Sequence, residues 1–255
     1  IRMATYRFFS SRFYLLIMFV VINLSLKGQD PRLKQPGLDL SLNEINYLHH
    51  LRPLLGGQNL VLSIKQSNFD TLHIDFKGRY IPTIRPPLVK IHATNMASVA
   101  AGGANSDPEA RGVASDVYIT SSGFQSFLPD PDDVFISNFI SVQNHAYGTG
   151  IENMYGIETK AYDEFCDRRP QIVHVFSPGN EGAAAPQEGT YAGLTGWANI
   201  SGQYKQSKNT ITVSAVDSSG QGSSYNSSGP AYDGRIKPEV ALFGAGGTSE
   251  AAALM

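Results

Sequence analysis

Short apolar runs recur along the chain from about residue 57 onward. They are rich in valine and isoleucine, and they alternate with stretches of small or helix-forming residues. Strands that read as near-continuous apolar runs are typical of a parallel sheet buried on both faces. The alternation therefore predicts an α/β domain of three layers. The runs are residues 59–64, 116–120, 133–144, 171–177 and 209–216, and the predicted helical stretches are residues 92–101, 150–166 and 247–255.

The amino terminus has a different pattern. Three arginines lie within the first twelve residues, ahead of the apolar run at residues 13–26 and a polar stretch. This order predicts a secretory signal peptide over residues 1–29. A membrane anchor is the alternative, but the run is shorter than the roughly 20 residues that cross a bilayer. We expect a secreted or extracytoplasmic protein that has no contact with the membrane after signal cleavage.

Residues 30–56 form a lead-in segment ahead of the main domain. Ser41 as a helix cap, with Glu44 three residues later and apolar residues at helical spacing, predicts one helix here. We interpret the adjacent His49 and His50 as solvated side chains rather than metal ligands. The main domain occupies residues 57–255, and we expect it to be truncated at its carboxyl end.

Composition narrows the function classes. With 255 residues, 42% of them hydrophobic and 16% charged, the chain can bury one large core. A net charge of −2 and the lack of a Lys/Arg-rich run argue against nucleic acid as a partner. The single cysteine, Cys166, excludes an internal disulfide or a thiolate metal cluster. We expect a monomer without a cofactor; a structural Ca²⁺ ion could bind in a loop, although no ligand-spaced Asp/Asn cluster is present.

Two polar residues follow or begin predicted elements and are candidates for chemistry. His92 opens a small-residue helix, where its ring could face the crevice at the strand ends; a buried or N-terminal histidine is the plainer alternative. Asn180 follows the run at residues 171–177, and its carboxamide could donate to an oxyanion at that strand's carboxyl end. A simple Gly-Asn turn is the other interpretation.

A third candidate, Ser249, lies at the start of the alanine-rich stretch 247–255. Its hydroxyl would be exposed at the helix's first turn, and its backbone N–H could face the same anion as Asn180. Alternatively, Thr248 or Ser249 is only a helix cap. The segment is not the G-x-S-x-G elbow of α/β-hydrolases, because Ala251 stands where that motif has glycine.

Order and spacing join these segments. The stretches HATNMAS, VHVFSPGNEG and GGTSEAAA resemble the HGTHVAG, VVVAAAGNEG and GTSMAAP motifs of the subtilisin-like serine proteases, the subtilases. The resemblance covers residues 57–255 and is closest to secreted subtilases of the Bacteroidetes type. It implies a three-layer subtilisin-like fold with a central, mostly parallel sheet flanked by helices. Further landmarks fall in the family's order at residues 112–119, 144–148, 211–230 and 233–240.

The resemblance also implies roles. Ser249 would attack the scissile carbonyl, His92 would take and return its proton, and Asn180 with the Ser249 N–H would bind the oxyanion. Ala146, Tyr147 and Gly148 would be the strand on which an extended peptide pairs its backbone. The expected activity is that of a secreted serine endopeptidase acting on peptide or protein substrates.

The acid of the triad departs from this pattern. When residues 70–79 are aligned with the family's DxTHPDFxGR tail, the catalytic aspartate falls on Gln66, which cannot carry the charge. Loss of this acid costs serine proteases about 10⁴-fold in turnover. Three explanations stay open: a silent or slowed homologue, Asp70 acting as substitute acid through a shifted turn, or a local sequence error. Asp70 could equally be a turn-capping aspartate.

Two rival functions follow from this departure. The first is a catalytically silent peptide-binding module of the subtilase fold, which holds a peptide along residues 146–148 without cutting it. The second is a non-peptidase hydrolase, such as an esterase, that uses Ser249; the missing nucleophile elbow counts against it. The direct connection between Pro238 and Gly247 also indicates that one wall of the cleft is trimmed.

Overall fold

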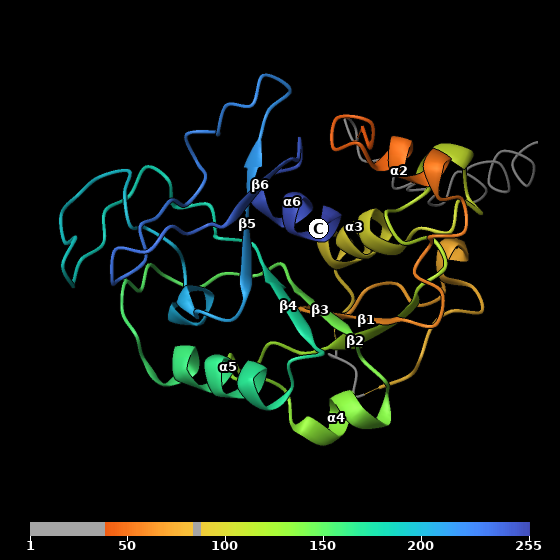
Figure 1. Ribbon diagram of the computed structural model, residues 1–255, viewed down its shortest axis with the longest axis horizontal. Coiled ribbons are helices and arrows are strands. Elements are labelled where there is room, and N and C mark those ends of the chain that lie inside the picture. Colours follow the sequence, from red (N-terminus) through yellow and green to blue (C-terminus); the bar gives the residue numbers. More distant parts are fainter. Residues whose placement is uncertain (1–38, 84–87) are drawn as a thin grey trace, which may run out of the picture. The chain divides into compact units, whose positions relative to one another are not determined.

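The computed structural model describes residues 39–83 and 88–255 (Figure 1). The predicted signal peptide at residues 1–29 and the first part of the lead-in segment lie outside the described residues. None of the helices in the described part of the chain has the length and apolarity that a bilayer crossing demands.

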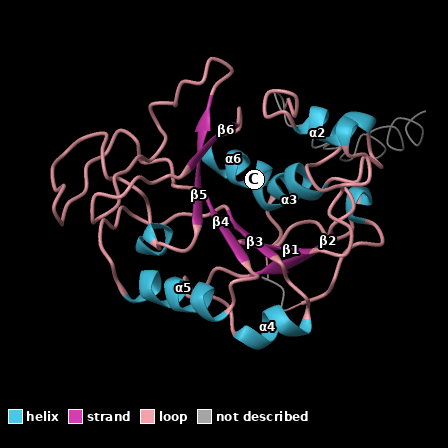
Figure 2. Cartoon of the chain, in the orientation of Figure 1, coloured by secondary structure: helices cyan, strands magenta, loops and turns pink. Residues whose placement is uncertain are grey.

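Six strands form one parallel sheet in the order β2-β1-β3-β4-β5-β6 (Figure 2). Every pairing between these strands is parallel, and helices lie between them in sequence, which confirms the expected fold class. The strands are β1 (Val61–Lys65), β2 (Tyr118–Ser122), β3 (Val142–His145), β4 (Val173–Phe176), β5 (Ile211–Val216) and β6 (Val240–Phe243). The helices are α2 (Ile45–Leu51), α3 (Ile91–Ala101), α4 (Asp132–Ser137), α5 (Ile157–Arg168) and α6 (Thr248–Leu254), with 3₁₀ turns at Ile74–Phe76, Pro108–Ala110 and Gln203–Gln206.

The alternation of side chains along β1 divides the core into two layers. Leu62 and Ile64 pack in the cluster that contains α3 and the end of α6. Val61, which points to the opposite face, packs with Phe135 of α4 and Phe165 of α5. The helices therefore cover both faces of the sheet, α3 and α6 on one and α4 and α5 on the other (Figure 1).

Small residues let α3 and α6 approach the sheet closely. Four buried alanines of α3 and the buried Ala253 and Leu254 of α6 belong to the same core cluster, and the two helices pack against each other. Side chains of this size leave little room between backbones. The ends of these two helices are consequently held at fixed positions relative to the strands.

The predicted strand at residues 133–144 is wrong in its first half. Residues 132–137 form α4, and only residues 142–145 form a strand. Asp132 and Asp133 lie in the first turn of α4, where the helix dipole stabilises acidic side chains. Phe139, with φ of 55°, then turns the chain out of the helix. Alternating apolar residues in a short run did not distinguish the two states.

The predicted helix at residues 150–166 begins later than expected. α5 starts at Ile157, and residues 150–156 form an irregular connection in which Ile151 makes an isolated antiparallel bridge with Ser201. Strand β6 was not predicted at all. Its four residues lie at the edge of the sheet and pair with β5 alone.

The lead-in segment is joined to the edge of the sheet. Asn43 donates through Nδ2 to the carbonyl of Phe243 at 2.8 Å and accepts from the Phe243 N–H at 2.9 Å. A side-chain amide thus replaces the missing neighbour of edge strand β6. Helix α2 forms nearby as expected, but Ser41 does not cap it: the Ser41 hydroxyl is bonded to Asp39, and Glu44 at the cap position has a left-handed backbone.

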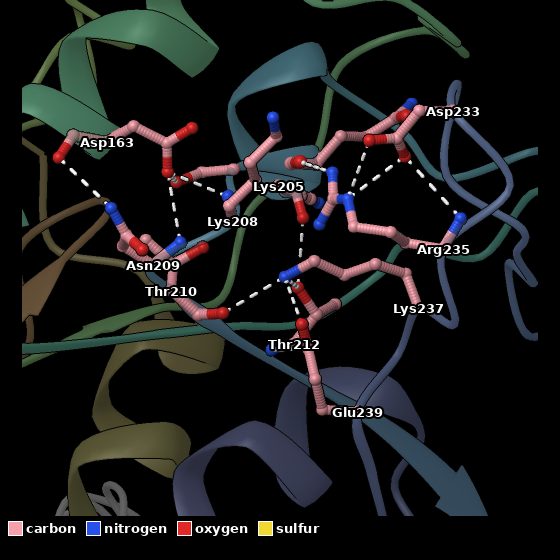
Figure 3. A network of polar contacts seen from close by, with 12 residues as sticks. Asp163, Lys205, Lys208, Asn209, Thr210, Thr212, Asp233, Arg235, Lys237 and Glu239 are labelled. Atoms are coloured by element: carbon pink, nitrogen blue, oxygen red, sulfur yellow. Dashed lines mark hydrogen bonds and ion pairs between the residues drawn. The ribbon is translucent and has the colours of Figure 1, made fainter.

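A polar network secures the amino ends of β5 and β6 (Figure 3). The buried Lys237 donates through Nζ to the Thr210 carbonyl at 3.0 Å and forms an ion pair with Glu239. Asp163 of α5 accepts from the N–H groups of Lys208 and Asn209 at 2.7 and 3.0 Å. Burial lowers the pKa of Lys237, and Glu239 opposes that shift. These contacts stabilise the end of the sheet away from the candidate catalytic residues.

Because Asn43 satisfies both backbone groups of Phe243, we predict that Asn43→Ala lowers the free energy of unfolding by about 1–2 kcal/mol. Urea denaturation followed by circular dichroism measures the change. His50→Ala, at an exposed position of α2, is the matched control and should shift stability by less than about 0.5 kcal/mol. Equal stability of Asn43→Ala and the parent would show that the lead-in segment does not brace β6.

Candidate active site at the carboxyl edge of the sheet

The predicted site residues gather where the parallel strands end. Gln66 directly follows β1, residues 146–148 follow β3, and Asn180 follows β4. Ser249 lies in the helix that follows β6. Because carboxyl ends of parallel strands share one edge of the sheet, these residues lie along that edge. His92 lies in the first turn of α3, the helix that packs on α6.

Asn180 is oriented by the helix that carries the candidate nucleophile. The buried Thr248 donates its hydroxyl to Asn180 Oδ1 at 2.9 Å. The amide oxygen is therefore occupied, and the exposed Asn180 keeps its NH₂ group for another acceptor. An oxyanion held there by one such donor gains roughly 3–4 kcal/mol in the transition state. The Thr248 contact thus favours the oxyanion role of Asn180 over that of a simple turn.

Ser249 occupies the second position of α6. The chain enters this helix through Gly247, whose φ of 100° only glycine adopts readily. Ser249 is half-buried, and its hydroxyl makes no hydrogen bond within the described residues, including none to His92. Catalytic hydrogen bonds are often loose before substrate binds, so this geometry is compatible with a nucleophile.

Glu250 is a residue of the site that sequence reasoning missed. It is buried in the first turn of α6, and its carboxylate accepts hydrogen bonds from the backbone N–H groups of Ala245 and Gly246. Burial raises the pKa of Glu250, and those two bonds oppose the shift. Glu250 has the spacing of the acidic residue in a capping box, three positions after the N-cap Gly247, and that spacing was the available signal, but its bonds go to Ala245 and Gly246 rather than to the Gly247 N–H. Glu250 thereby holds the loop that leads to Ser249.

His92 has no anionic partner among the described residues. Its side chain is exposed at the start of α3, yet the surrounding protein removes enough water to lower the pKa of the ring. A neutral imidazole is the form that can accept a proton from a serine. A carboxylate beside the ring would shift the pKa upward instead.

Gln66 lies at the end of β1 but does not contact His92 through a hydrogen bond. Its backbone N–H donates to the Ser122 carbonyl at 3.0 Å, which continues the pairing of β1 with β2. Its side chain is 3% exposed, and Nε2 is buried without a hydrogen-bond partner in the described part of the chain. A buried N–H donor without an acceptor lowers the stability of the fold by about 1–3 kcal/mol. The position predicted for the triad acid thus carries an amide that is not satisfied.

Asp70 is placed as a turn-capping residue. It is exposed, and its Oδ1 accepts from the Leu72 N–H at 3.0 Å. Its own N–H donates to Thr94 Oγ1 of α3 at 2.9 Å. Across residues 39–83 and 88–255 no hydrogen bond joins its carboxylate to His92. The contacts therefore agree with the turn interpretation of Asp70.

The residues predicted to form the substrate strand, 146–148, lie just beyond the end of β3 and have no regular secondary structure. The ring of Tyr147 is buried against Phe124 at 5.1 Å between centroids, and its hydroxyl lies 3.1 Å from His145 Nδ1. Burial raises the pKa of Tyr147 well above its usual value. Gly148, by contrast, is exposed. Within residues 146–148, Ala146 and Tyr147 are therefore buried, whereas Gly148 is accessible.

Comparisons with known proteins identify the family and the fold. Residues 57–254 match the model of the subtilase family, Peptidase_S8. Among solved structures, the CspB protease of Clostridium perfringens is 12% identical, with a TM-score of 0.66 over 85% of this chain and 86% of that one. The prenylagaramide maturation protease PagA is 17% identical, with a TM-score of 0.56 over 84% and 76%.

A third similar structure is a cold-adapted subtilisin-like serine proteinase, 17% identical, with a TM-score of 0.51 over 79% of this chain and 74% of that one. At these identities the structural likeness shows the fold alone. Among curated proteins, none matches the chain.

The surroundings of His92 predict its titration. We expect the parent protein to show a midpoint below 6.5 for His92, because desolvation favours the neutral ring and no carboxylate opposes it. Gln66→Glu should raise the midpoint if position 66 faces the ring, since an anion favours the imidazolium. Asp70→Asn should leave it unchanged. NMR titration of the imidazole Cε1–H measures all three, and a midpoint that falls in Asp70→Asn would instead identify Asp70 as the partner of His92.

Proposed function

The chain belongs to the subtilase family, and we propose that it is a secreted serine endopeptidase with Ser249 as nucleophile and an impaired triad. The observation that carries this proposal is the Thr248–Asn180 hydrogen bond. It links the segment with the candidate oxyanion donor to the segment with the candidate nucleophile. A helix cap alone does not need that link, and the link supports the proposal because it leaves the Asn180 NH₂ group available to an oxyanion.

The proposed reaction follows from these positions. Ser249 Oγ attacks the peptide carbonyl while its proton passes to His92, and the oxyanion is bound by the Asn180 NH₂ group and the Ser249 N–H. His92 then gives the proton to the leaving amine, and a water molecule repeats the sequence to release the acyl group. An extended peptide would pair its backbone with residues 146–148 during both steps.

Gln66 lowers the rate expected from this mechanism. Within the described part of the chain, the imidazolium formed on His92 has no carboxylate to stabilise it, and turnover should fall by about 10⁴-fold relative to a complete triad. Oxyanion binding and substrate positioning do not depend on that charge, so a residual rate remains. The chemistry needs no metal or organic cofactor.

A silent peptide-binding module is the second candidate function. The unsatisfied Gln66 amide favours it, because nothing in the described residues replaces the missing charge. Both candidates share the peptide-binding strand and differ only in whether Ser249 reacts. Export, the monomeric state and a Bacteroidetes-type origin stay predictions from the sequence pattern.

Labelling with a fluorophosphonate probe separates the two candidates. We expect slow labelling of the purified full-length protein and none of Ser249→Ala. Gln66→Glu should label faster than the parent, because its carboxylate would restore part of the missing stabilisation. A parent that stays unlabelled while Gln66→Glu reacts would support the binding module, and equal labelling of the parent and Ser249→Ala would refute Ser249 as nucleophile.

The Thr248 contact gives a separate prediction. Thr248→Val keeps the side-chain shape but releases Asn180, and we expect labelling to slow by about tenfold, the equivalent of one hydrogen bond. Asn180→Ala should cost more, about 10²–10³-fold. Thr159→Val is the matched control, because it also removes a buried threonine's hydrogen bond but lies on α5. Labelling rates that fall equally in the two threonine variants would point to general destabilisation instead.

A further inference from the structure

A cavity of about 370 Å³ is lined in part by Gly244 and Ala245, in the loop that leads to Ser249, and has no role in the mechanism above. It is formed at the carboxyl ends of β5 and β6. Its walls are the end of β5, parts of the loop from Asp217 to Tyr225, and Phe243, Gly244 and Ala245 at the end of β6 and beyond it. We call it the β5–β6 pocket.

The pocket is joined to the catalytic segments on two sides. The hydroxyl of Tyr225 lies 3.5 Å from the point that a Cβ on Gly247 would occupy, directly before α6. The carbonyl of Tyr225 accepts from the Gly182 N–H at 2.9 Å, just after Asn180. Ala245, another wall residue, donates to Glu250 next to Ser249. The pocket is therefore held in a fixed relation to both the nucleophile and the oxyanion donor.

The strand order places the pocket on one side of the scissile bond. The sheet contains the strand order β3-β4-β5-β6. The proposed peptide-binding segment follows β3, and Asn180 follows β4. Under the proposed function, an acyl half paired with residues 146–148 would have its carbonyl at Asn180. A leaving half that continues in the same direction would then run along the sheet edge toward the ends of β5 and β6.

Resting on the proposed function, we propose that the β5–β6 pocket binds a residue of the leaving half, C-terminal to the scissile bond, and favours a basic side chain there. Among the residues that line the pocket, Asp217 is the one charged group. The pocket thus offers a carboxylate and no competing cation.

The chemistry of the walls fits a lysine or arginine. Asp217 Oδ1 accepts from Ser219 and Gln221, and these bonds hold the pKa of its carboxyl below the usual value, so the charge is present at neutral pH. Oδ2 makes no hydrogen bond within the described residues and is open to a ligand. The exposed ring of Tyr225 can face a cation, and Ala215 and Val216 can contact its alkyl stem.

Binding of uncleavable peptides tests this inference on the parent protein. Fluorescent peptides with a ketomethylene group in place of the scissile amide carry lysine, norleucine or glutamate at the first or second position after that group. We expect the lysine peptide at one of these positions to bind about two- to fivefold more tightly than norleucine, the range of an exposed ion pair, and glutamate to bind worst. The preference should fade at 1 M salt.

Asp217→Asn keeps an oxygen for the turn but removes the charge, and it should abolish the preference for lysine over norleucine. Asp133→Asn, which removes one acid from α4 on the other face of the sheet, is the control and should retain that preference. Equal binding of lysine and norleucine peptides, a preference unaffected by Asp217→Asn, or no binding at millimolar peptide would each overturn the inference.

The outcome is separable from that of the proposed function. Fluorophosphonate labelling of Ser249 with no lysine preference would leave the peptidase standing and reject the basic subsite. A lysine preference that depends on Asp217 in a protein that never labels would keep the subsite and support the binding module instead.

Discussion

The hydrogen bond from Thr248 to Asn180 joins segments that are 68 residues apart in sequence. It can form only because β4 and β6 run in the same direction, so that the loop after one and the helix after the other meet at one edge of the sheet. The alanines of α3 and α6 are part of the same constraint. With larger side chains there, α6 would lie farther from the sheet, and its first turn would not reach Asn180.

Glu250 extends this constraint to the loop before the helix. Its buried carboxylate bonds two backbone N–H groups of the loop, at a helix end that already favours negative charge. Ser249 therefore lies between two fixed contacts, Thr248 to Asn180 and Glu250 to the loop. Neither contact involves His92 or Gln66. The parts of the site that would bind an oxyanion are consequently independent of the parts that would transfer a proton.

The sequence predicted the elements whose pattern is unambiguous. The runs that became β4 and β5 lie between turn residues and were placed within two residues at each end. The first half of the predicted strand at residues 133–144 was wrong because helix and strand share the same apolar content over so short a run, and the two aspartates in the first turn of α4 favour the helix. Strand β6 was not predicted because its four residues, three half-exposed and one exposed, carry little periodicity at a sheet edge. Such edges depend on tertiary partners, here Asn43, which no local pattern reveals.

Within the site, too, some contacts follow from the sequence pattern and others depend on tertiary packing. The motifs predicted that Asn180 and the start of the Ser249 helix lie together. The Thr248–Asn180 hydrogen bond joins these two segments, and strand order sets that contact. Motif spacing could not show that the Gln66 Nε2 group is buried without a hydrogen-bond partner, because that depends on side-chain packing beyond the end of β1.

The unsatisfied Gln66 amide has a further physical consequence. A buried donor without an acceptor costs free energy, and a catalytic aspartate would replace that loss with a charge that attracts the imidazolium. The fold tolerates the loss because the large apolar clusters on both faces of the sheet, rather than the site, supply its stability. For proton transfer, by contrast, nothing in the described residues replaces the missing charge. Under the proposed function, such a chain would keep its peptide-binding edge and its oxyanion donors, while its rate would depend on a single side chain at the end of β1.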